Sequence, residues 1–262
     1  MNLRTNFIYE GFRFPRKCFF SKFTEEIFNF RKYGTPEKGD TALIKKVRTD
    51  ELFECKTEYL ARLFESAEYP WEMIPKIKEY VTELISEGIE GYTLIAEGVL
   101  VGENVKIYPT ATIEAPAVIG RGSEVRPGAF IRGCVITGEG CVIGNSSELK
   151  NCVLLDGVQV PHYNYVGDSV LGNKAHLGAG SVCSNLKSDG KNVVVHADEE
   201  YETGLRKLGA VLADGADVGC GCVLNPGTVI GKRTSVYPRT SVRGVIEEDS
   251  IVKSMDNIVK RR

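Results

Sequence analysis

The chain has 262 residues, of which 42% are hydrophobic, a size and composition typical of one large or two small globular domains. Its 33 Lys and Arg residues nearly balance its 35 Asp and Glu residues, so the net charge is only -2. This balance gives no basis for binding to nucleic acid or to an anionic membrane surface, and no apolar run is long enough to span a bilayer.

Residues 1–48 are predicted to form an N-terminal extension whose structure the sequence does not define. This segment is richer in bases than in acids, and its aromatic residues are scattered. It lacks the continuous apolar core, followed by small residues, that marks a secretory signal peptide.

The 8 cysteines show no paired spacing of the kind that holds zinc. Cys220 and Cys222 are separated by one residue and have no second pair or histidine nearby. We therefore expect reduced, mostly buried thiols, no metal ion, and a cytoplasmic protein.

Residues 49–91 follow a helical period and are predicted to form a small α-helical cap. Asp50 is expected to cap a first short helix, and Pro70 to redirect the chain. Apolar residues at spacings of three and four then predict an amphipathic helix that ends at Gly88 and Gly91: Trp71, Ile74, Ile77, Val81, Leu84 and Ile85. We expect this cap to cover the first coil of the following domain and to protect its open sheet edge.

After Gly91 the period changes to six. Thr137 and Pro161 fall at two steps of a series that is otherwise aliphatic: Ile95, Val101, Ile107, Ile113, Ile119, Val125, Ile131, Ile143, Leu149 and Leu155. The next residue is often Gly. A period of six fits a short strand followed by a tight turn, and three such units close a triangular coil. Residues 92–250 are therefore predicted to form an all-β solenoid, a left-handed parallel β-helix of hexapeptide repeats.

The series continues through Val166, Leu171 and Leu177, with one five-residue step, and resumes at Leu212. Residues 183–210 interrupt it with an irregular, polar stretch, which we interpret as a loop ejected from the solenoid. Long loops in regular folds are commonly functional. Residues 251–262 are predicted to be a C-terminal tail.

Polar residues break the repeat most strongly between Val160 and Asn185. Lys150 and His162 are twelve residues apart, which is two hexapeptides. We therefore expect them on nearby sides of successive coils.

At this point the sequence resembles the acetyltransferase domain of bifunctional sugar-1-phosphate nucleotidylyltransferases, enzymes that make UDP-N-acetylglucosamine. The likeness covers roughly residues 92–246, and residues 204–209 resemble the archaeal-type members. The motifs that carry it are Arg126-Pro127-Gly128, Glu148-Leu149-Lys150, His162, Tyr165-Val166-Gly167-Asp168-Ser169, His176-Leu177-Gly178-Ala179-Gly180 and Asn185. The resemblance implies transfer of an acetyl group from acetyl-CoA to an amino sugar phosphate of the glucosamine-1-phosphate type, or to a sugar nucleotide.

His162 is the candidate general base of this reaction, because only histidine is poised near neutral pH without help. By resemblance, Arg126 and Lys150 hold the phosphate of the acceptor, and Tyr165 and Asn185 hold its sugar.

Two further positions are expected to serve the acyl donor. A backbone N–H near Ala179 is a candidate partner for the developing oxyanion. By resemblance, the pantetheine arm of the donor runs near Ala210 and along the coils beyond Leu212, in a groove between subunits. The flat faces of such a prism need partners, so we expect a homotrimer.

Two departures from the family bear on function. The chain before Tyr92 is too short for the α/β nucleotidylyltransferase domain and has no Gly-rich nucleotide-binding loop, so pyrophosphorylase activity is not expected. Leu186 stands where family members often have an aromatic residue.

Two other classes of function stay open. Some hexapeptide β-helices bind zinc through three histidines and hydrate carbon dioxide, but here His162, His176 and His196 are not paired on one coil. The second alternative is a non-catalytic β-helix that binds a sugar nucleotide, or serves in assembly, alongside a separate nucleotidylyltransferase.

Overall fold

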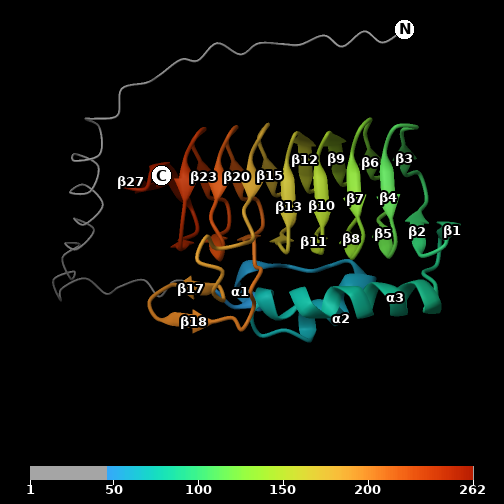
Figure 1. Cartoon of the computed structure of the whole chain (residues 1–262), viewed down its shortest axis with the longest axis horizontal. Helices are drawn as coiled ribbons and strands as arrows, with labels where there is room; N and C mark the ends of the chain where they lie inside the picture. The colour runs from blue at the N-terminus through green and yellow to red at the C-terminus, as the bar shows by residue number, and fades with distance from the viewer. Residues whose placement is uncertain (1–45, 262) are drawn as a thin grey trace, which may run out of the picture. The chain divides into compact units, whose positions relative to one another are not determined.

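The computed structural model describes residues 46–261, so nearly all of the predicted extension at residues 1–48 lies outside the described part. Its strands form three long sheets, which we call A, B and C, in a solenoid of stacked coils (Figure 1). The predicted left-handed parallel β-helix with a small helical cap is confirmed.

Sheet A contains β1 (Tyr92–Ala96), β2 (Val99–Gly102), β5 (Ala117–Ile119), β8 (Val135–Thr137), β11 (Cys152–Leu154), β14 (Val170–Leu171), β19 (Ala210–Leu212), β22 (Thr228–Ile230) and β25 (Val245–Ile246). Sheet B contains β3 (Lys106–Ile107), β6 (Glu124–Val125), β9 (Val142–Asn145), β12 (Gln159–His162), β15 (His176–Leu177), β20 (Asp217–Val218), β23 (Ser235–Val236), β26 (Ser250–Ser254) and β27 (Asn257–Lys260). Sheet C contains β4 (Thr112–Glu114), β7 (Phe130–Arg132), β10 (Glu148–Lys150), β13 (Tyr165–Gly167), β16 (Val182–Cys183), β21 (Val223–Leu224) and β24 (Ser241–Val242).

Each full coil passes from sheet B to sheet C and then to sheet A, and each strand pairs in parallel with its equivalent in the next coil. The inward side chains of successive coils form a continuous buried core inside the prism. Thr137, the polar residue of the series, is buried as well, and it pairs with Leu154 of the next coil in sheet A. Its hydroxyl accepts a hydrogen bond from the backbone of Gly120 at 2.9 Å, which satisfies the buried polar group.

The predicted series slips at Leu155. The strand register places Leu154, not Leu155, in line with Thr137, so the step after Leu149 is five residues. Leu155 packs instead into a second core outside sheet A. The next inward residue is accordingly Val160 rather than Pro161. Because Leu154 and Leu155 are both apolar, either could be the inward residue. Hydrophobicity alone therefore does not show where the five-residue step lies.

The prediction that Ile95 points inward is also wrong. It lies in β1, which turns back and pairs antiparallel with β2, and its side chain is 52% exposed. This antiparallel strand occupies the edge of sheet A at the first coil.

The glycines that follow many inward residues are explained by the close stacking of coils. A β-carbon on Gly144 would collide with the carbonyl of Pro161 in the next coil. Equivalent collisions occur at Gly120 and Gly178, against Gly138 and Cys220. At these turns the backbones approach too closely for any side chain.

The helical cap consists of α1 (Thr49–Leu52), α2 (Glu58–Glu65), the 3-10 turns η1 (Pro70–Glu72) and η2 (Ile74–Lys76), and α3 (Ile77–Glu87). Arg48 rather than Asp50 precedes the first helix as its N-cap. The predicted long helix begins only at Ile77, because Pro70 and Pro75 each lie in a 3-10 turn. It ends at Gly88, whose φ is 77°, as expected.

The cap is not confined to the first coil. It runs along the outer side of sheet A (Figure 1), where the second core joins the helices to the outward residues of that sheet. These outward residues are Leu100, Val118, Ile136, Val153, Val170, Val211, Val229 and Val245.

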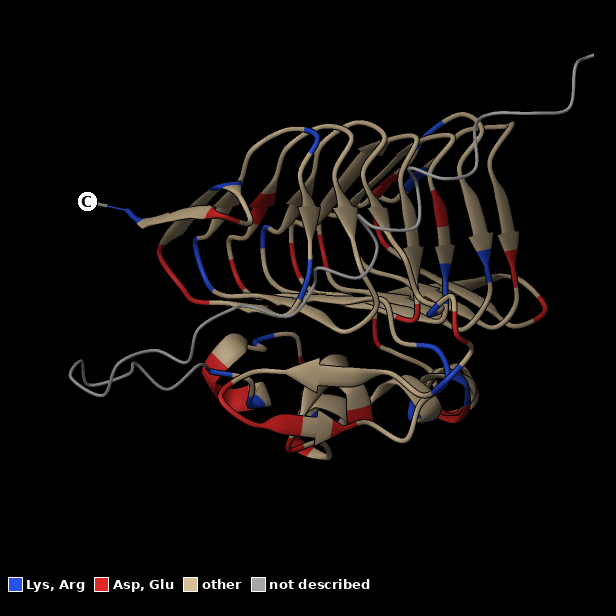
Figure 2. Ribbon diagram, turned by 60° about the vertical axis from the view of Figure 1, so that its left-hand side comes forward, with Lys and Arg blue, Asp and Glu red and all other residues tan. Residues whose placement is uncertain are grey.

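The predicted loop at residues 183–210 contains an antiparallel hairpin of β17 (Val194–His196) and β18 (Glu200–Glu202). The hairpin continues the helical layer (Figure 1), since Val193 and Val195 are buried in the same second core. Tyr201 packs with ring centroids 5.3 Å from Tyr69 and 5.8 Å from Trp71. Figure 2 shows acidic residues gathered on this layer of helices and hairpin, which we call the outer layer.

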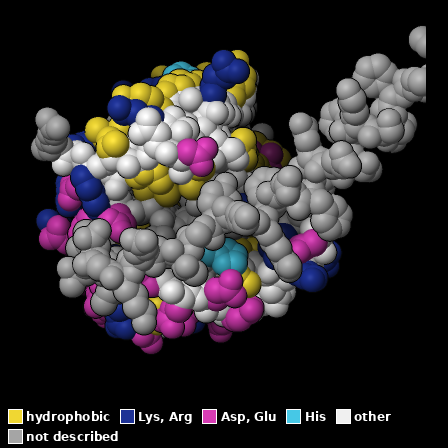
Figure 3. All heavy atoms as spheres, turned by 90° about the vertical axis from the view of Figure 1, so that its left-hand side faces the viewer, with side chains coloured by type: hydrophobic (Ala, Val, Ile, Leu, Met, Phe, Trp, Pro, Cys, Tyr) yellow, Lys and Arg dark blue, Asp and Glu magenta, His cyan; other side chains and the backbone are white. Residues whose placement is uncertain are grey.

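The β-helix continues past residue 250. β26 pairs in parallel with β23, and β27 folds back antiparallel on β26, so the predicted tail is largely strand. Figure 3 views this end of the molecule and shows hydrophobic side chains at its surface. The exposed large apolar residues in these last coils are Tyr237, Met255, Ile258 and Val259. No helix in the described part of the chain is both long and apolar enough to cross a membrane.

Candidate functional site

A buried carboxylate lies at the turn between sheets C and A, which we call the C–A corner. Asn151, Asp168 and Asn185 are 17 residues apart and stack there in successive coils. One carboxylate oxygen of Asp168 accepts a hydrogen bond from the Asn151 amide at 2.8 Å, and the other accepts one from the Asn185 amide at 2.5 Å. Asp168 is only 4% exposed. The three side chains therefore form one connected group.

The corner has a backbone conformation that suits these residues. Asn151 and Asp168 both have φ of 48°, in the left-handed region. Asn and Asp tolerate this region better than other residues with a side chain. The Asn and Asp residues at these positions therefore favour this turn, and the same side chains form the polar group.

Tyr165 extends this group onto the outer side of sheet C. Its hydroxyl accepts a hydrogen bond from the Asn185 amide at 3.1 Å. The absence of a side chain at Gly167 makes room, because a β-carbon there would lie 2.5 Å from the Tyr165 hydroxyl and 2.7 Å from the Asn185 amide nitrogen. Burial raises the pKa of Tyr165 above its ordinary value, while the hydrogen bond from Asn185 opposes that rise.

Lys150 lies beside this group. It is the last residue of β10, immediately before Asn151, and pairs in register with Gly167 of the next coil. The structure therefore brings together three of the predicted substrate-binding residues, Lys150, Tyr165 and Asn185, on one edge of sheet C.

His162 lies at the other edge of sheet C, at the turn that we call the B–C corner. It ends β12, and only two residues separate it from Tyr165. The buried amide of Asn164 fixes this turn: its oxygen accepts a hydrogen bond from the backbone of His162 at 3.0 Å, and its nitrogen donates one to the carbonyl of Gly178 at 2.8 Å. The imidazole of His162 is exposed at a rigid corner.

Ala179 and Arg126 lie near the same corner. Gly180, which follows Ala179, donates a backbone hydrogen bond to the carbonyl of His162 at 3.0 Å. Arg126 follows β6, two coils from His162, and its guanidinium lies 3.1 Å from the Glu124 carboxylate. This hydrogen bond lowers the pKa of Glu124.

Ala210 lies apart from the other candidates. It is in β19 on sheet A, with its side chain in the interior of the prism. Its backbone N–H donates to the hydroxyl of Ser169 at 3.0 Å. Within this chain it takes part in the coil rather than in the surface around His162 and Tyr165.

Sequence reasoning did not single out Asp168 or Asn151 as functional. Asp168 belongs to the family motif, but the resemblance implies no role for it. The common spacing of 17 from Asn151 to Asp168 and from Asp168 to Asn185 was the available signal. A series with steps of six does not show this spacing, because 17 is not a multiple of six.

The other two histidines have carboxylate partners. The Nδ1 of His176 lies 2.8 Å from Asp217 on sheet B, and the Nδ1 of His196 lies 3.2 Å from Glu200 in the hairpin. Among residues 46–261 no three or more His, Cys, Asp or Glu side chains are grouped so that they could hold a metal ion.

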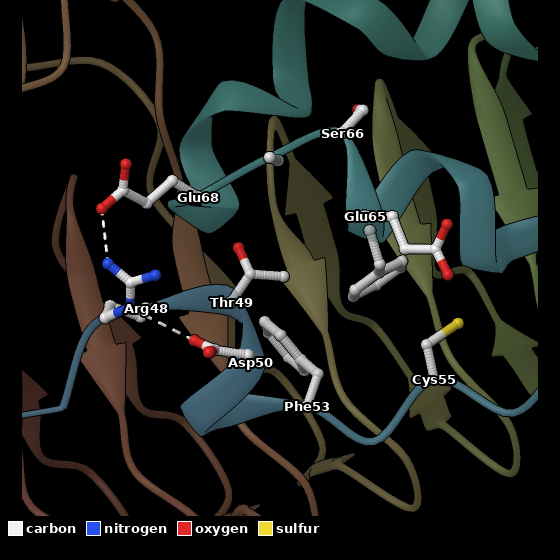
Figure 4. Close-up of a pocket in the computed structure, with 10 residues that line it drawn as sticks. Arg48, Thr49, Asp50, Phe53, Cys55, Glu65, Ser66 and Glu68 are labelled. Carbon is white, nitrogen blue, oxygen red and sulfur yellow. Dashed lines mark hydrogen bonds and ion pairs between the residues drawn. The ribbon is translucent and has the colours of Figure 1, made fainter.

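A pocket of about 490 Å³ lies in the outer layer (Figure 4). Its lining includes the ion pairs of Arg48 with Glu68 at 2.5 Å and with Asp50 at 3.4 Å. The buried hydroxyl of Thr49 in its wall has no hydrogen-bond partner among residues 46–261. None of the predicted site residues lines this pocket.

The sequence is similar to known proteins over parts of its length. The family model of the GMPPB C-terminal domain matches residues 113–200. GlmU of Methanococcus maripaludis strain S2, a bifunctional protein, is 31% identical over 194 residues, which is 73% of this chain and 47% of the relative. The bifunctional sugar-1-phosphate nucleotidylyltransferase/acetyltransferase of Sulfurisphaera tokodaii is 37% identical over 87 residues, or 33% of this chain and 22% of the relative. The chain thus spans less than half the length of either relative.

Solved structures of similar shape are more distant. PerB from Caulobacter crescentus, in complex with CoA and GDP-perosamine, is 20% identical, with a TM-score of 0.35 over 56% of this chain and 52% of the other. The acetyltransferase domain of PglB from Neisseria gonorrhoeae, in complex with acetyl coenzyme A, is 14% identical, with a TM-score of 0.32 over 71% and 66%.

The strand topology shows a β-helix of hexapeptide repeats, and the sequence matches show that this β-helix is similar to the GMPPB C-terminal domain over residues 113–200 and to GlmU over 73% of the chain.

Proposed function

We propose that the chain is an N-acetyltransferase that moves an acetyl group from acetyl-CoA to the amine of an amino sugar phosphate or a sugar nucleotide. The observation that carries the proposal is the surface around sheet C. There Lys150, Tyr165 and Asn185 meet at one edge, and His162 stands at the other edge beside Tyr165. Glucosamine-1-phosphate is the first acceptor to test, since GlmU of Methanococcus maripaludis matches 73% of this chain.

The proposed chemistry needs a base, a cation and oriented hydrogen-bonding groups. The acceptor amine attacks the thioester carbon; its C–N bond forms as the C–S bond breaks, and CoA leaves as the thiolate. His162 accepts the proton that the amine loses and returns it to the solvent or to the CoA thiolate, which becomes the free thiol. Lys150 provides a positive charge for the phosphate of the acceptor. CoA or acetyl-CoA is bound in the PerB and PglB structures, which supports acetyl-CoA as the donor.

A second candidate function is a non-catalytic subunit that binds a sugar nucleotide or serves in assembly. One observation favours it: the ring of His162 has no hydrogen-bond partner within residues 46–261, whereas the ring of His176 is oriented by Asp217. Catalytic histidines are commonly held by a carboxylate or carbonyl.

Release of the CoA thiol distinguishes the two functions. Purified chain is mixed with acetyl-CoA and glucosamine-1-phosphate, then with other amino sugar phosphates and amino sugar nucleotides, and free thiol is followed by a colorimetric reagent. We expect thiol release that depends on the acceptor. Binding of a sugar nucleotide without thiol release from any acceptor would favour the non-catalytic subunit.

We also predict a homotrimer. The outer layer already covers sheet A, so the surfaces left for neighbouring subunits are those of sheets B and C. A trimer would place a neighbour against the surface around His162 and complete a groove for the donor. Sedimentation equilibrium at micromolar concentration is expected to give three times the chain mass of 28.8 kDa. A monomeric mass would contradict this assembly.

We place the enzyme in the cytoplasm. The seven described cysteines are free, and Cys141, Cys152, Cys183 and Cys222 are buried in the coils. Free thiols of this number are usual in reducing compartments.

A further inference from the structure

We propose that Asp168 is a positioning residue that sets the direction of the hydrogen bonds at Asn185 and Tyr165. In this arrangement the site offers the acceptor sugar one hydrogen-bond acceptor, the Asn185 carbonyl oxygen, and one donor, the Tyr165 hydroxyl. The inference rests on the proposed function for the identity of the ligand, but the direction of the hydrogen bonds follows from the structure alone.

The position of Asp168 is fixed on every side. Its backbone N–H donates to the carbonyl of Lys150 at 3.0 Å, and its carbonyl accepts from Gly209 at 2.8 Å. One carboxylate oxygen is held by Asn151, whose amide also donates to the carbonyl of Ile74 in the outer layer at 3.4 Å. The remaining oxygen faces Asn185. The carboxylate therefore cannot turn away from that amide.

The chemistry of the groups then determines the rest. An ionised carboxylate only accepts hydrogen bonds, so Asn185 must present its NH₂ group, not its oxygen, to Asp168. The same nitrogen lies 3.1 Å from the Tyr165 hydroxyl, so its second hydrogen points to the phenolic oxygen. Both hydrogens of the amide are used inside the protein, and its carbonyl oxygen is left for another partner.

The direction of the Tyr165 hydroxyl is set in the same way. Since Tyr165 accepts from Asn185, its own hydrogen must be donated elsewhere. A free amide can rotate and exchange its oxygen and nitrogen, but an amide held by a carboxylate cannot. The pair Asn185 and Tyr165 is therefore a preset acceptor and donor, which matches neighbouring hydroxyl groups of a sugar.

Two variants separate the effect of hydrogen-bond direction from the effect of side-chain packing. Asp168→Asn keeps the shape and tolerates the left-handed φ of 48°, but its amide cannot accept from both neighbours, so one of them must reverse. The double variant Asp168→Asn/Asn185→Asp restores a complete set of hydrogen bonds around the corner. It also reverses their direction, because the new carboxylate at position 185 takes the hydrogen of Tyr165.

A measurement without ligand tests the direction itself. Protein labelled with ¹³C at the ζ carbon of tyrosine is titrated by NMR, and Tyr165→Phe identifies the Tyr165 signal. In the wild type the bond from Asn185 favours the phenolate; in the double variant a carboxylate opposes it. We expect the pKa of Tyr165 to be higher in the double variant than in the wild type. Equal pKa values would overturn the proposed direction.

A kinetic measurement tests the consequence for the acceptor. With acetyl-CoA and glucosamine-1-phosphate, we expect Asp168→Asn to raise the KM of the acceptor about tenfold or more and to leave the KM of acetyl-CoA within about twofold. The double variant should regain the melting temperature of the wild type and still have the raised acceptor KM. A double variant with wild-type KM would show that only the packing matters, and would overturn the inference.

Failure of the proposed function is recognised separately. If the wild type releases no thiol with any acceptor, the acetyltransferase proposal fails. In that case UDP-N-acetylglucosamine and N-acetylglucosamine-1-phosphate are added to the labelled protein. A shift of the Tyr165 signal in the wild type, reduced in the double variant, would support the preset pair as a sugar-binding element. No shift with either ligand would overturn it.

Discussion

Replacement of His162 by alanine is expected to lower the kcat of acetyl transfer by a factor of about 10² to 10⁴, the usual effect of removing a general base. The imidazole is exposed at the B–C corner and makes no hydrogen bond through its ring within the described residues, so its loss removes chemistry rather than packing. Thiol release measures the rate, and circular dichroism on heating confirms that the fold is retained.

His196→Ala is the matched control, because this exposed histidine lies in the hairpin, on the outer layer. We expect it to leave the rate unchanged. Lys150→Ala is expected to act mainly on the KM of the phosphate-bearing acceptor, since it removes a charge that binds and not a group that reacts. Near-normal activity of His162→Ala would mean that another group is the base, and His176 with its partner Asp217 would be the next to test.

Replacement of Trp71 by alanine is expected to lower the free energy of unfolding by about 3–5 kcal/mol, as for other buried tryptophans. The side chain is 4% exposed in the second core. It stacks on Tyr69 with centroids 4.9 Å apart and planes 7° apart, and it packs against Tyr201 of the hairpin. Its removal leaves a large cavity where helices and hairpin meet. Unfolding in guanidinium chloride gives the change in free energy.

Tyr237→Ala serves as a control of similar chemistry, because that ring is 47% exposed. Its effect should stay within about 0.5 kcal/mol. A Trp71→Ala protein as stable as the wild type would mean that the outer layer contributes little to the stability of the β-helix.

The sequence allowed the coil to be predicted, but not where its length changes. A repeat of six identifies the fold because every third unit returns to the same sheet, and Ile119, Ile131 and Ile143 lie inward as expected. The shortening at Leu154 depends on which of two leucines meets Thr137 in the neighbouring coil. That choice is made by backbone pairing between coils, and it leaves no trace in the hydrophobicity of the segment.

The position of the outer layer was missed for a related reason. The stripe of α3 showed that one face is buried, but a stripe does not say against what. The partners are outward valines and isoleucines such as Val118, Ile136 and Val153, each next to an inward residue of the same strand. Strands that are apolar on both sides are the signal that a second layer covers sheet A.

Most of the candidate site came from the family resemblance, which named Lys150, His162, Tyr165 and Asn185. The carboxylate among them was not identified, because its role depends on contacts between coils. The shortened coils bring Asn151, Asp168 and Asn185 to the same corner, and the hydrogen bonds that join them follow only from that alignment.

The outer layer also bears on how the protein unfolds. A solenoid whose coils touch only their neighbours has mostly short-range contacts and can lose coils one at a time from an end. Here the segment from Lys46 to Thr57 reaches across many coils: Lys46 pairs with Glu248 at 2.5 Å, the backbone of Glu54 accepts from Asn173 at 2.9 Å, and the hydroxyl of Thr57 donates to Asp156 at 2.7 Å. Contacts between residues 99 to 202 positions apart in the chain couple early and late coils. Fraying at the last coil therefore breaks bonds to the first described residues, so the outer layer favours a single cooperative transition over stepwise loss of repeats.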